Sequence, residues 1–228
     1  MNFLKHRDRL QKMDLEGRFS YIFEHNLWGS KESRSGIGST PLETAVVRKE
    51  IPVTLRKIGA SSILDVPCGD FRWMCHVDLR AVRYVGADIV PGVVASNREK
   101  FSSPSQRFLQ LDLTVDPLPT ADLVLCRDCL VHLSYANIHR AIENVKRSGA
   151  KWILMTDFLQ IETNTDIADG DWRPLNFTRP PFNFPIPHLT IVENCHEAGG
   201  AFDDSRLVCG ELLTYRRPPM RLQFSCRC

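Results

Sequence analysis

The sequence of 228 residues contains no long apolar run and no strong excess of one charge. No stretch approaches the ~18 consecutive apolar residues of a membrane helix, and the N-terminal segment MNFLKHRDRLQKMDLEGRF has no apolar core of signal-peptide length. The 29 basic and 27 acidic residues give a formal net charge of +2. We therefore expect a cytoplasmic protein, with no membrane span and no basic surface of the kind used by dedicated nucleic-acid binders.

The eight cysteines do not form the pattern of a metal site or of a disulfide framework. Cys126-x-x-Cys129 has metal-ligand spacing, but no second pair matches it. In a chain of this length without a secretory signal, this number of cysteines is typical of reduced thiols. The sequence Cys226-Arg-Cys228 also lacks the order of a prenylation signal. We expect free thiols and no bound metal.

A loop rich in glycine and serine, WGSKESRSGIGST, covers residues 28–40 but lacks the Gly-Lys-Ser/Thr sequence of a phosphate-binding loop. It also comes before the first predicted strand. Gly36 and Gly38 allow unusual backbone angles. Two interpretations remain open: a lid that folds over a ligand, with Trp28 presenting its ring, or an ordinary surface loop with Trp28 in the core.

Short apolar runs alternate with helical patterns through residues 60–158. Strands are predicted over 61–66, 82–89, 106–113, 121–128 and 150–158, and helices over 71–77, 91–101 and 134–149. One or two helices over 3–27, and another over about 41–57, come before them. Strands separated by helices pair in parallel through right-handed crossovers, so this pattern predicts a doubly wound α/β sheet.

The remainder of the chain departs from this alternation. Residues 159–187 are rich in proline and aromatic residues, and segments of this length inside a domain usually have a function. A helix over about 188–198 and two final strands, over 205–216 and 221–226, are predicted to follow. We expect a single domain over 1–228. It comprises N-terminal helices and a lid (1–58), a cofactor-binding core (60–158), a substrate-side insertion (159–187) and a C-terminal helix and strands (188–228).

Acidic residues end the first three predicted strands, where open α/β sheets bind their ligands. Asp65 lies in ILDVPCGD, Asp88 follows Gly69 by nineteen residues, and Asp112 lies in LQLDL. A carboxylate after the second strand can accept hydrogen bonds from both hydroxyls of a ribose. A single aspartate at a strand end is often only a turn residue. A series of them at matched intervals favours a nucleoside site.

The segments ILDVPCGD, YVGADIV, RFLQLDL and ADLVLCRDCLVHLS, in this order and at these intervals, resemble class I S-adenosylmethionine-dependent methyltransferases over about residues 60–158. The flanking segments resemble a bacterial-type branch of that superfamily. The usual first motif is acidic-x-Gly-x-Gly-x-Gly. Here Pro67 replaces the first glycine and Phe71 the third, which disfavours the close backbone approach that NAD or FAD needs.

The resemblance implies a mostly parallel, Rossmann-like sheet with helices on both faces and a C-terminal antiparallel strand pair. It also implies S-adenosylmethionine as the cofactor. Asp65 would orient the first loop, Asp88 would hold the ribose, and Arg127 would lie near the sulfonium through its carbonyl. Trp28 could face the sulfonium as a π-face. The full set of implied cofactor residues is Trp28, Ser39, Asp65, Pro67, Cys68, Gly69, Asp88, Ile89, Asp112, Leu113 and Arg127.

Methyl transfer requires a nucleophile held at near-attack distance and, for some acceptors, a base. Candidate bases are Asp128, His132 and Asp157, although a histidine in the sequence LVHLS often only packs. Candidate substrate residues are Arg34, Arg173 and Asn176. The sequence predicts an O- or N-methyltransferase acting on a small molecule or a glycan. The alternatives are a protein or RNA methyltransferase and a non-catalytic cofactor-binding protein.

Overall fold

A computed structural model describes residues 5–200 and 204–212. Its centre is a seven-stranded sheet with the order β3-β2-β1-β4-β5-β7-β6. The first five strands run in parallel, and β7 is antiparallel to both β5 and β6. The strands are β1 (Ser62–Asp65), β2 (Arg83–Asp88), β3 (Gln106–Gln110), β4 (Leu123–Cys126), β5 (Trp152–Phe158), β6 (Leu189–Val192) and β7 (Ser205–Glu211). The predicted mostly parallel sheet with a C-terminal antiparallel pair is confirmed.

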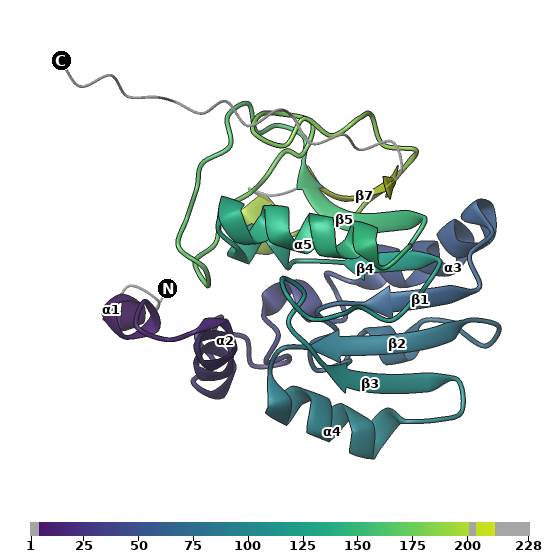
Figure 1. Cartoon of the computed structure of the whole chain (residues 1–228), viewed down its shortest axis with the longest axis horizontal. Helices are drawn as coiled ribbons and strands as arrows, with labels where there is room; N and C mark the ends of the chain where they lie inside the picture. The colour runs from purple at the N-terminus through teal and green to yellow at the C-terminus, as the bar shows by residue number, and fades with distance from the viewer. Residues whose placement is uncertain (1–4, 201–203, 213–228) are drawn as a thin grey trace.

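Helices cover both faces of the sheet, as predicted. Helix α5 (Tyr135–Arg147) lies on one face, and α3 (Ala45–Ile58) and α4 (Pro91–Phe101) pack on the other (Figure 1). Successive strand residues point to opposite faces. Leu64 and Val124 therefore join the core under α5, whereas Ile63 and Leu123 join the core under α3 and α4. The central strands are buried on both sides, which explains their nearly continuous apolar sequences.

Two N-terminal helices lie opposite the carboxyl ends of the parallel strands (Figure 1). These are α1 (Arg7–Leu10) and α2 (Leu15–Glu24), and Asp14 caps α2 by accepting a hydrogen bond from the Gly17 amide at 2.8 Å. Leu10, Ile22 and Leu27 bury their side chains in a small core of their own. Within the described ranges, no helix combines the length and apolar character needed to cross a membrane.

Two predicted elements differ from the structure, and a third lies outside the described residues. The helix expected over 188–198 is wrong at its start, where β6 pairs with β7, because Leu189 and Ile191 face inward while Thr190 and Val192 are exposed. That alternation has the period of a strand. The expected helix over 71–77 is only a 3₁₀ turn at Met74–His76. The predicted strand over 221–226 lies outside the described residues.

The insertion over 159–187 contains no helix or strand, yet it packs closely against α5. Phe177 and Phe182 are fully buried, with ring centroids 4.8 Å apart, and Phe182 also meets Tyr135 edge-on at 5.2 Å. Asn176 donates hydrogen bonds to the carbonyls of Leu159 and Ile161. Aromatic packing and side-chain amide bonds thus replace the regular hydrogen bonding that the segment lacks.

The packing of the Phe108 and Tyr84 rings depends on Gly86 in β2, which leaves space for them. A methyl group at this position would lie 2.8 Å from Phe108 and 3.0 Å from Tyr84, so Gly86→Ala must push two packed rings apart. We expect it to lower the free energy of unfolding by about 1–3 kcal/mol, as overpacking of a core does. Urea denaturation measures this. Gly210→Ala in β7 is the matched control, because no atom lies within 4 Å of the added methyl. Equal stability of the two variants would contradict the packing argument.

Candidate active site

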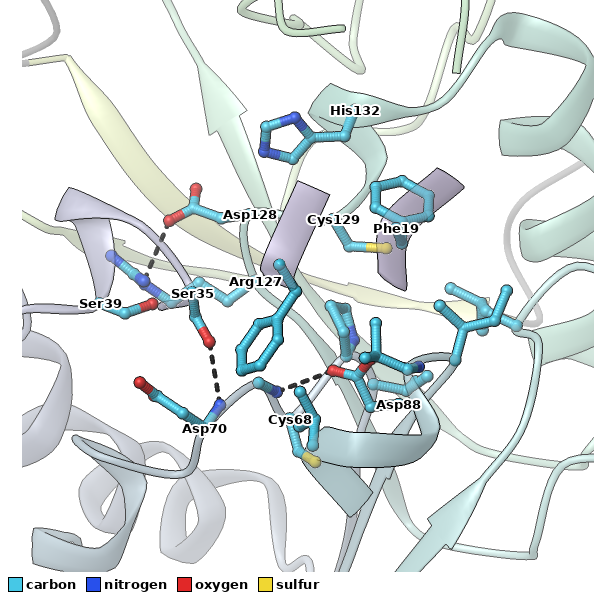
Figure 2. A pocket seen from close by; sticks show the side chains of 18 of the residues that line it. Phe19, Ser35, Ser39, Cys68, Asp70, Asp88, Arg127, Asp128, Cys129 and His132 are labelled. Carbon is cyan, nitrogen blue, oxygen red and sulfur yellow. Dashed lines mark hydrogen bonds and ion pairs between the residues drawn. The ribbon is translucent and has the colours of Figure 1, made fainter. Parts of the chain in front are cut away.

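A cavity that is partly open to solvent lies at the carboxyl ends of β1 to β4. Its floor comes from the loops that follow these strands. Its other walls come from α2 and from the loop over 28–40 (Figure 2). The lining includes Leu15, Phe19, Phe23, Trp28, Ser35, Ser39, Pro67, Cys68, Gly69, Asp70, Trp73, Asp88, Ile89, Asp112, Leu113, Arg127, Asp128, Cys129 and His132. The site therefore combines acidic side chains with an aromatic wall.

Asp88 joins the first two strand ends. Its carboxylate accepts hydrogen bonds from the amides of Gly69 and Val90, both at 3.0 Å. Burial raises the pKa of Asp88 to about 6, although these backbone donors act in the opposite direction. Each carboxylate oxygen carries two lone pairs, so Asp88 can still accept further hydrogen bonds from a ligand.

Asp65 lies below the cavity floor and does not line it. It is buried, and its carboxylate accepts a 2.6 Å hydrogen bond from the Tyr84 hydroxyl. Burial raises the pKa of Asp65 to about 7, while the Tyr84 hydrogen bond lowers it. Asp65 therefore acts through the position of the loop that follows it.

The loop over 28–40 is hydrogen-bonded to the loop after β1. The Ser33 hydroxyl donates to Asp70 at 2.8 Å, and the Asp70 amide donates to the Ser35 hydroxyl at 2.9 Å (Figure 2). Gly69 has a positive φ of 53°, and a Cβ there would lie 2.4 Å from the Ser35 oxygen. Because Gly69 has no side chain, there is room beside it for Ser35 of the loop over 28–40 and for a ligand.

Asp112 lies at the far end of the cavity, between Leu111 and Leu113. One of its carboxylate oxygens, Oδ1, accepts hydrogen bonds from the amide and the hydroxyl of Thr114, both at 2.7 Å. The Asp112 amide donates to Asp116. The turn is fixed by these bonds, and within the described chain Oδ2 has no donor, so it remains available to a ligand.

A buried charge network begins where β4 ends. The Arg127 guanidinium bonds Glu193 at 2.7 Å and Asp128 at 3.0 Å, and it lies 5.6 Å from the centre of the Trp73 ring. Glu193 also accepts a hydrogen bond from the Ser205 hydroxyl at 2.9 Å. Burial raises the pKa of Glu193, and Arg127 opposes that rise. One cation therefore stands between two carboxylates at the edge of the cavity.

His132 has a defined orientation at the opposite wall (Figure 2). Its Nδ1 lies 2.9 Å from the carbonyl oxygen of Asp171, which can only accept, so Nδ1 carries the proton. The ring centroid is 5.4 Å from that of Trp28. Burial lowers the pKa of His132, which favours the neutral ring with its lone pair on Nε2.

Residues 63–150, less than half of the chain, match the family model described as "Methyltransferase domain". This match lies within the region whose sequence resembles class I S-adenosylmethionine-dependent methyltransferases. No family model matches half of the chain, so the match shows a similarity of this region. No curated protein matches the chain by sequence.

Two solved structures resemble this chain over most of its length. Human N-acetylserotonin methyltransferase in complex with SAM has a TM-score of 0.55 and 15% identity, with 86% of this chain and 56% of that chain covered. The 1,6-didemethyltoxoflavin-N1-methyltransferase of Burkholderia thailandensis, with bound 1,6-didemethyltoxoflavin and S-adenosylhomocysteine, has a TM-score of 0.56 and 14% identity, with 86% of both chains covered. At this identity the likeness concerns the fold. The chain spans little more than half of the human protein.

The chemistry of the cavity lining suits S-adenosylmethionine. Asp88 has oxygens free for ribose hydroxyls, and Asp112 Oδ2 can accept from an exocyclic amine. The sulfonium is a cation, and the lining carries four carboxylates. Cation–π contact with the aromatic wall would add to this attraction.

Five predicted site residues lie outside the cavity lining. Besides Asp65, Asp157 is buried on β5, where it bonds the Phe177 amide and Arg206. Arg173 is buried, and its guanidinium donates to the carbonyls of Leu130, Leu133 and Thr165. Asn176 holds the insertion together, as described above, and Arg34 donates to the carbonyls of Phe23 and Glu24. Asp157, Arg173 and Asn176 thus bond backbone groups of irregular segments, whereas Arg34 bonds the end of α2 and Asp65 bonds the Tyr84 hydroxyl. Sequence does not separate such structural roles from ligand binding.

Other lining residues were not predicted from sequence. Phe19 and Phe23 come from α2, and the helical spacing of such residues does not distinguish a core from a cavity wall. Ser35 and Asp70 are linked across 35 positions, and Glu193 meets Arg127 across 66. Asp70 could have been predicted from its position directly after Gly69. No local sequence feature indicates the role of Glu193.

Asp65 and Asp88 should make the ligand-free protein less stable as the pH rises. Their pKa values, about 7 and about 6, exceed the ordinary value of 3.8, so the folded state binds more protons than the unfolded chain between these limits. The free energy of unfolding therefore falls as pH rises through this window. Asp65→Asn should reduce this fall by an amount on the order of 4 kcal/mol. Urea denaturation at a series of pH values tests this, and a pH dependence equal to that of the parent protein would contradict it.

Ser33→Ala should loosen the loop over 28–40 without removing a residue that lines the cavity. It deletes the hydrogen bond to Asp70 and the one accepted from the Ser35 amide at 3.1 Å. At about 0.5–1.5 kcal/mol each, their loss should speed amide exchange in the loop about tenfold and weaken S-adenosylhomocysteine binding severalfold. Exchange mass spectrometry and calorimetry measure both. Ser96→Ala on α4 serves as the control, and indifference of both quantities to Ser33→Ala would argue against this role.

Proposed function

We propose that the chain transfers a methyl group from S-adenosylmethionine to an oxygen or nitrogen atom of a small-molecule or glycan acceptor, with His132 as the base. The observation that carries the proposal is the fixed tautomer of His132. The Asp171 carbonyl holds its Nδ1 proton, and the lone pair of Nε2 is left for the cavity. A general base must have this lone pair available near the acceptor.

The cover over one side of the cavity supports a small acceptor. Aromatic residues of α2, together with Trp28, cover the strand ends, and the loop over 28–40 is bonded to the loop after β1. This cover restricts the access of a bulky polymer to the strand ends. We infer that this loop acts as a lid, which excludes water and holds the acceptor close to the donor.

The cofactor supplies an electrophilic methyl carbon, and the protein supplies position and proton transfer. Asp88 and Asp112 would hold the nucleoside, and the loop of Pro67, Cys68 and Gly69 would contact the rest of the cofactor. Arg127 fixes the carboxylate of Asp128 by the 3.0 Å ion pair. Asp128 can then orient the acceptor while His132 receives its proton.

Incubation with methyl-labelled S-adenosylmethionine and a cell extract tests the acceptor class. The extract is separated into small molecules, glycans, proteins and nucleic acids. Label in the small-molecule or glycan fraction supports the proposal. Label confined to protein or RNA would replace it with the corresponding alternative, and tight cofactor binding without transfer to any fraction would indicate a non-catalytic binding protein.

His132→Gln should lower kcat for an identified acceptor about 10²–10⁴-fold, the usual contribution of general acid–base catalysis. The affinity for S-adenosylhomocysteine should change less than threefold, since the proposed role concerns the acceptor proton. Steady-state kinetics and calorimetry separate the two effects. His188→Gln, an exposed histidine beside Trp152, is the control. Retention of full kcat by His132→Gln would exclude the histidine as the base.

A further inference from the structure

The charge of the cavity restricts the acceptor. Asp70, Asp88, Asp112 and Asp128 all line it, and among the described residues Arg127 is the one cation of the lining. His132 is held neutral by burial. The sulfonium of the donor would leave an excess of carboxylates. A negatively charged acceptor would therefore enter against the field of the site.

Arg127 is not placed to attract an anion. Its guanidinium is buried, bonds Glu193 and Asp128, and lies against the Trp73 ring. An anionic acceptor would have to displace one of two carboxylates already in place. The arginines predicted to bind the substrate, Arg34 and Arg173, are bonded to backbone carbonyls outside the cavity.

Asp128 is the carboxylate best placed to meet an acceptor. Its side chain is 34% exposed, against 2% for that of Glu193. A left-handed backbone (φ 49°) and the bond from its amide to Thr156 at 2.8 Å fix its position. Phe19, Phe23 and Trp28 line the same cavity. Carboxylates combined with aromatic faces are a recognition site for organic ammonium groups.

We propose that the methyl acceptor is an amine, which enters as an ammonium ion and is held by Asp128 and the aromatic wall. This inference rests on the proposed function. The amine nitrogen loses one proton to His132 Nε2, and its lone pair then bonds the methyl carbon. The carbon–sulfur bond breaks with its electron pair remaining on sulfur. The products are an N-methylammonium ion and the thioether, and His132 returns its proton to solvent.

Binding to the protein saturated with S-adenosylhomocysteine tests the charge preference without requiring turnover. Three probes share one ring: 2-phenylethylamine, 2-phenylethanol and phenylacetate. By competition calorimetry or ligand-observed NMR, the amine should bind at least tenfold more tightly than phenylacetate and more tightly than the alcohol. Raising NaCl from about 0.05 to 0.5 M should weaken the amine severalfold and leave the alcohol unchanged, because salt screens charge interactions.

Asp128→Asn is the decisive variant. Asparagine tolerates the left-handed backbone at this position, so the variant should fold. It should lower the ratio of amine to alcohol affinity at least fivefold. Asp78→Asn makes the same charge change at an exposed site and should leave the ratio unaltered.

The result separates this inference from the proposed function. Phenylacetate binding as tightly as the amine, an affinity ratio unchanged by Asp128→Asn, or no detectable binding of the amine would overturn the amine assignment. Methyl transfer could still occur in that case, to a different acceptor. Conversely, a clear amine preference without transfer to any acceptor would support the charge selection and contradict the proposed catalysis.

Discussion

The shape of the cavity depends on the contact between the loop over 28–40 and the loop after β1. Gly69 lacks a side chain, the Ser35 hydroxyl occupies the space so created, and Asp70 binds both Ser33 and Ser35. Together with the bonds between Arg18 of α2 and Asp169, this contact holds the aromatic residues of α2 and Trp28 near the strand ends. Gly69 leaves room for a ligand beside the backbone and also accommodates Ser35. The loop after β1 and the loop over 28–40 are therefore coupled through this one residue.

The sequence was sufficient where local pattern determines structure. Alternating strands and helices predicted the parallel sheet, and aspartates at strand ends predicted Asp88 and Asp112 on the cavity wall. Local pattern failed where distant segments meet. Arg173 and Asn176 were expected to face a substrate, but Arg173 donates to the carbonyls of Leu130 and Leu133 in the turn after β4, and Asn176 donates to that of Leu159 in the insertion. Strand β6 was missed because four residues of alternating burial are too short to outweigh the polar residues that follow them.

The carboxylates at the carboxyl ends of the parallel strands lower the stability of the fold and favour the binding of a positively charged ligand. Burial raises the pKa values of Asp65 and Asp88, so keeping them ionised opposes folding at neutral pH. A bound cation lowers the free-energy cost of keeping these carboxylates ionised. Ligand binding and folding are therefore linked, and the protein should gain stability from a positively charged ligand beyond the contacts that it makes.

The position of β7 between β5 and β6 has a topological consequence. Since β7 is antiparallel to both neighbours, β6 again runs in the direction of the central strands. Its carboxyl end returns to the ligand edge, and that is how Glu193 reaches Arg127. A peripheral strand with few interior side chains thus sets the charge balance of a site built by the central ones. Detachment of β6 would leave the central strands paired but would remove Glu193 from the buried guanidinium of Arg127. Local unfolding at this edge of the sheet would therefore change the electrostatics of the site before it disrupts the central sheet.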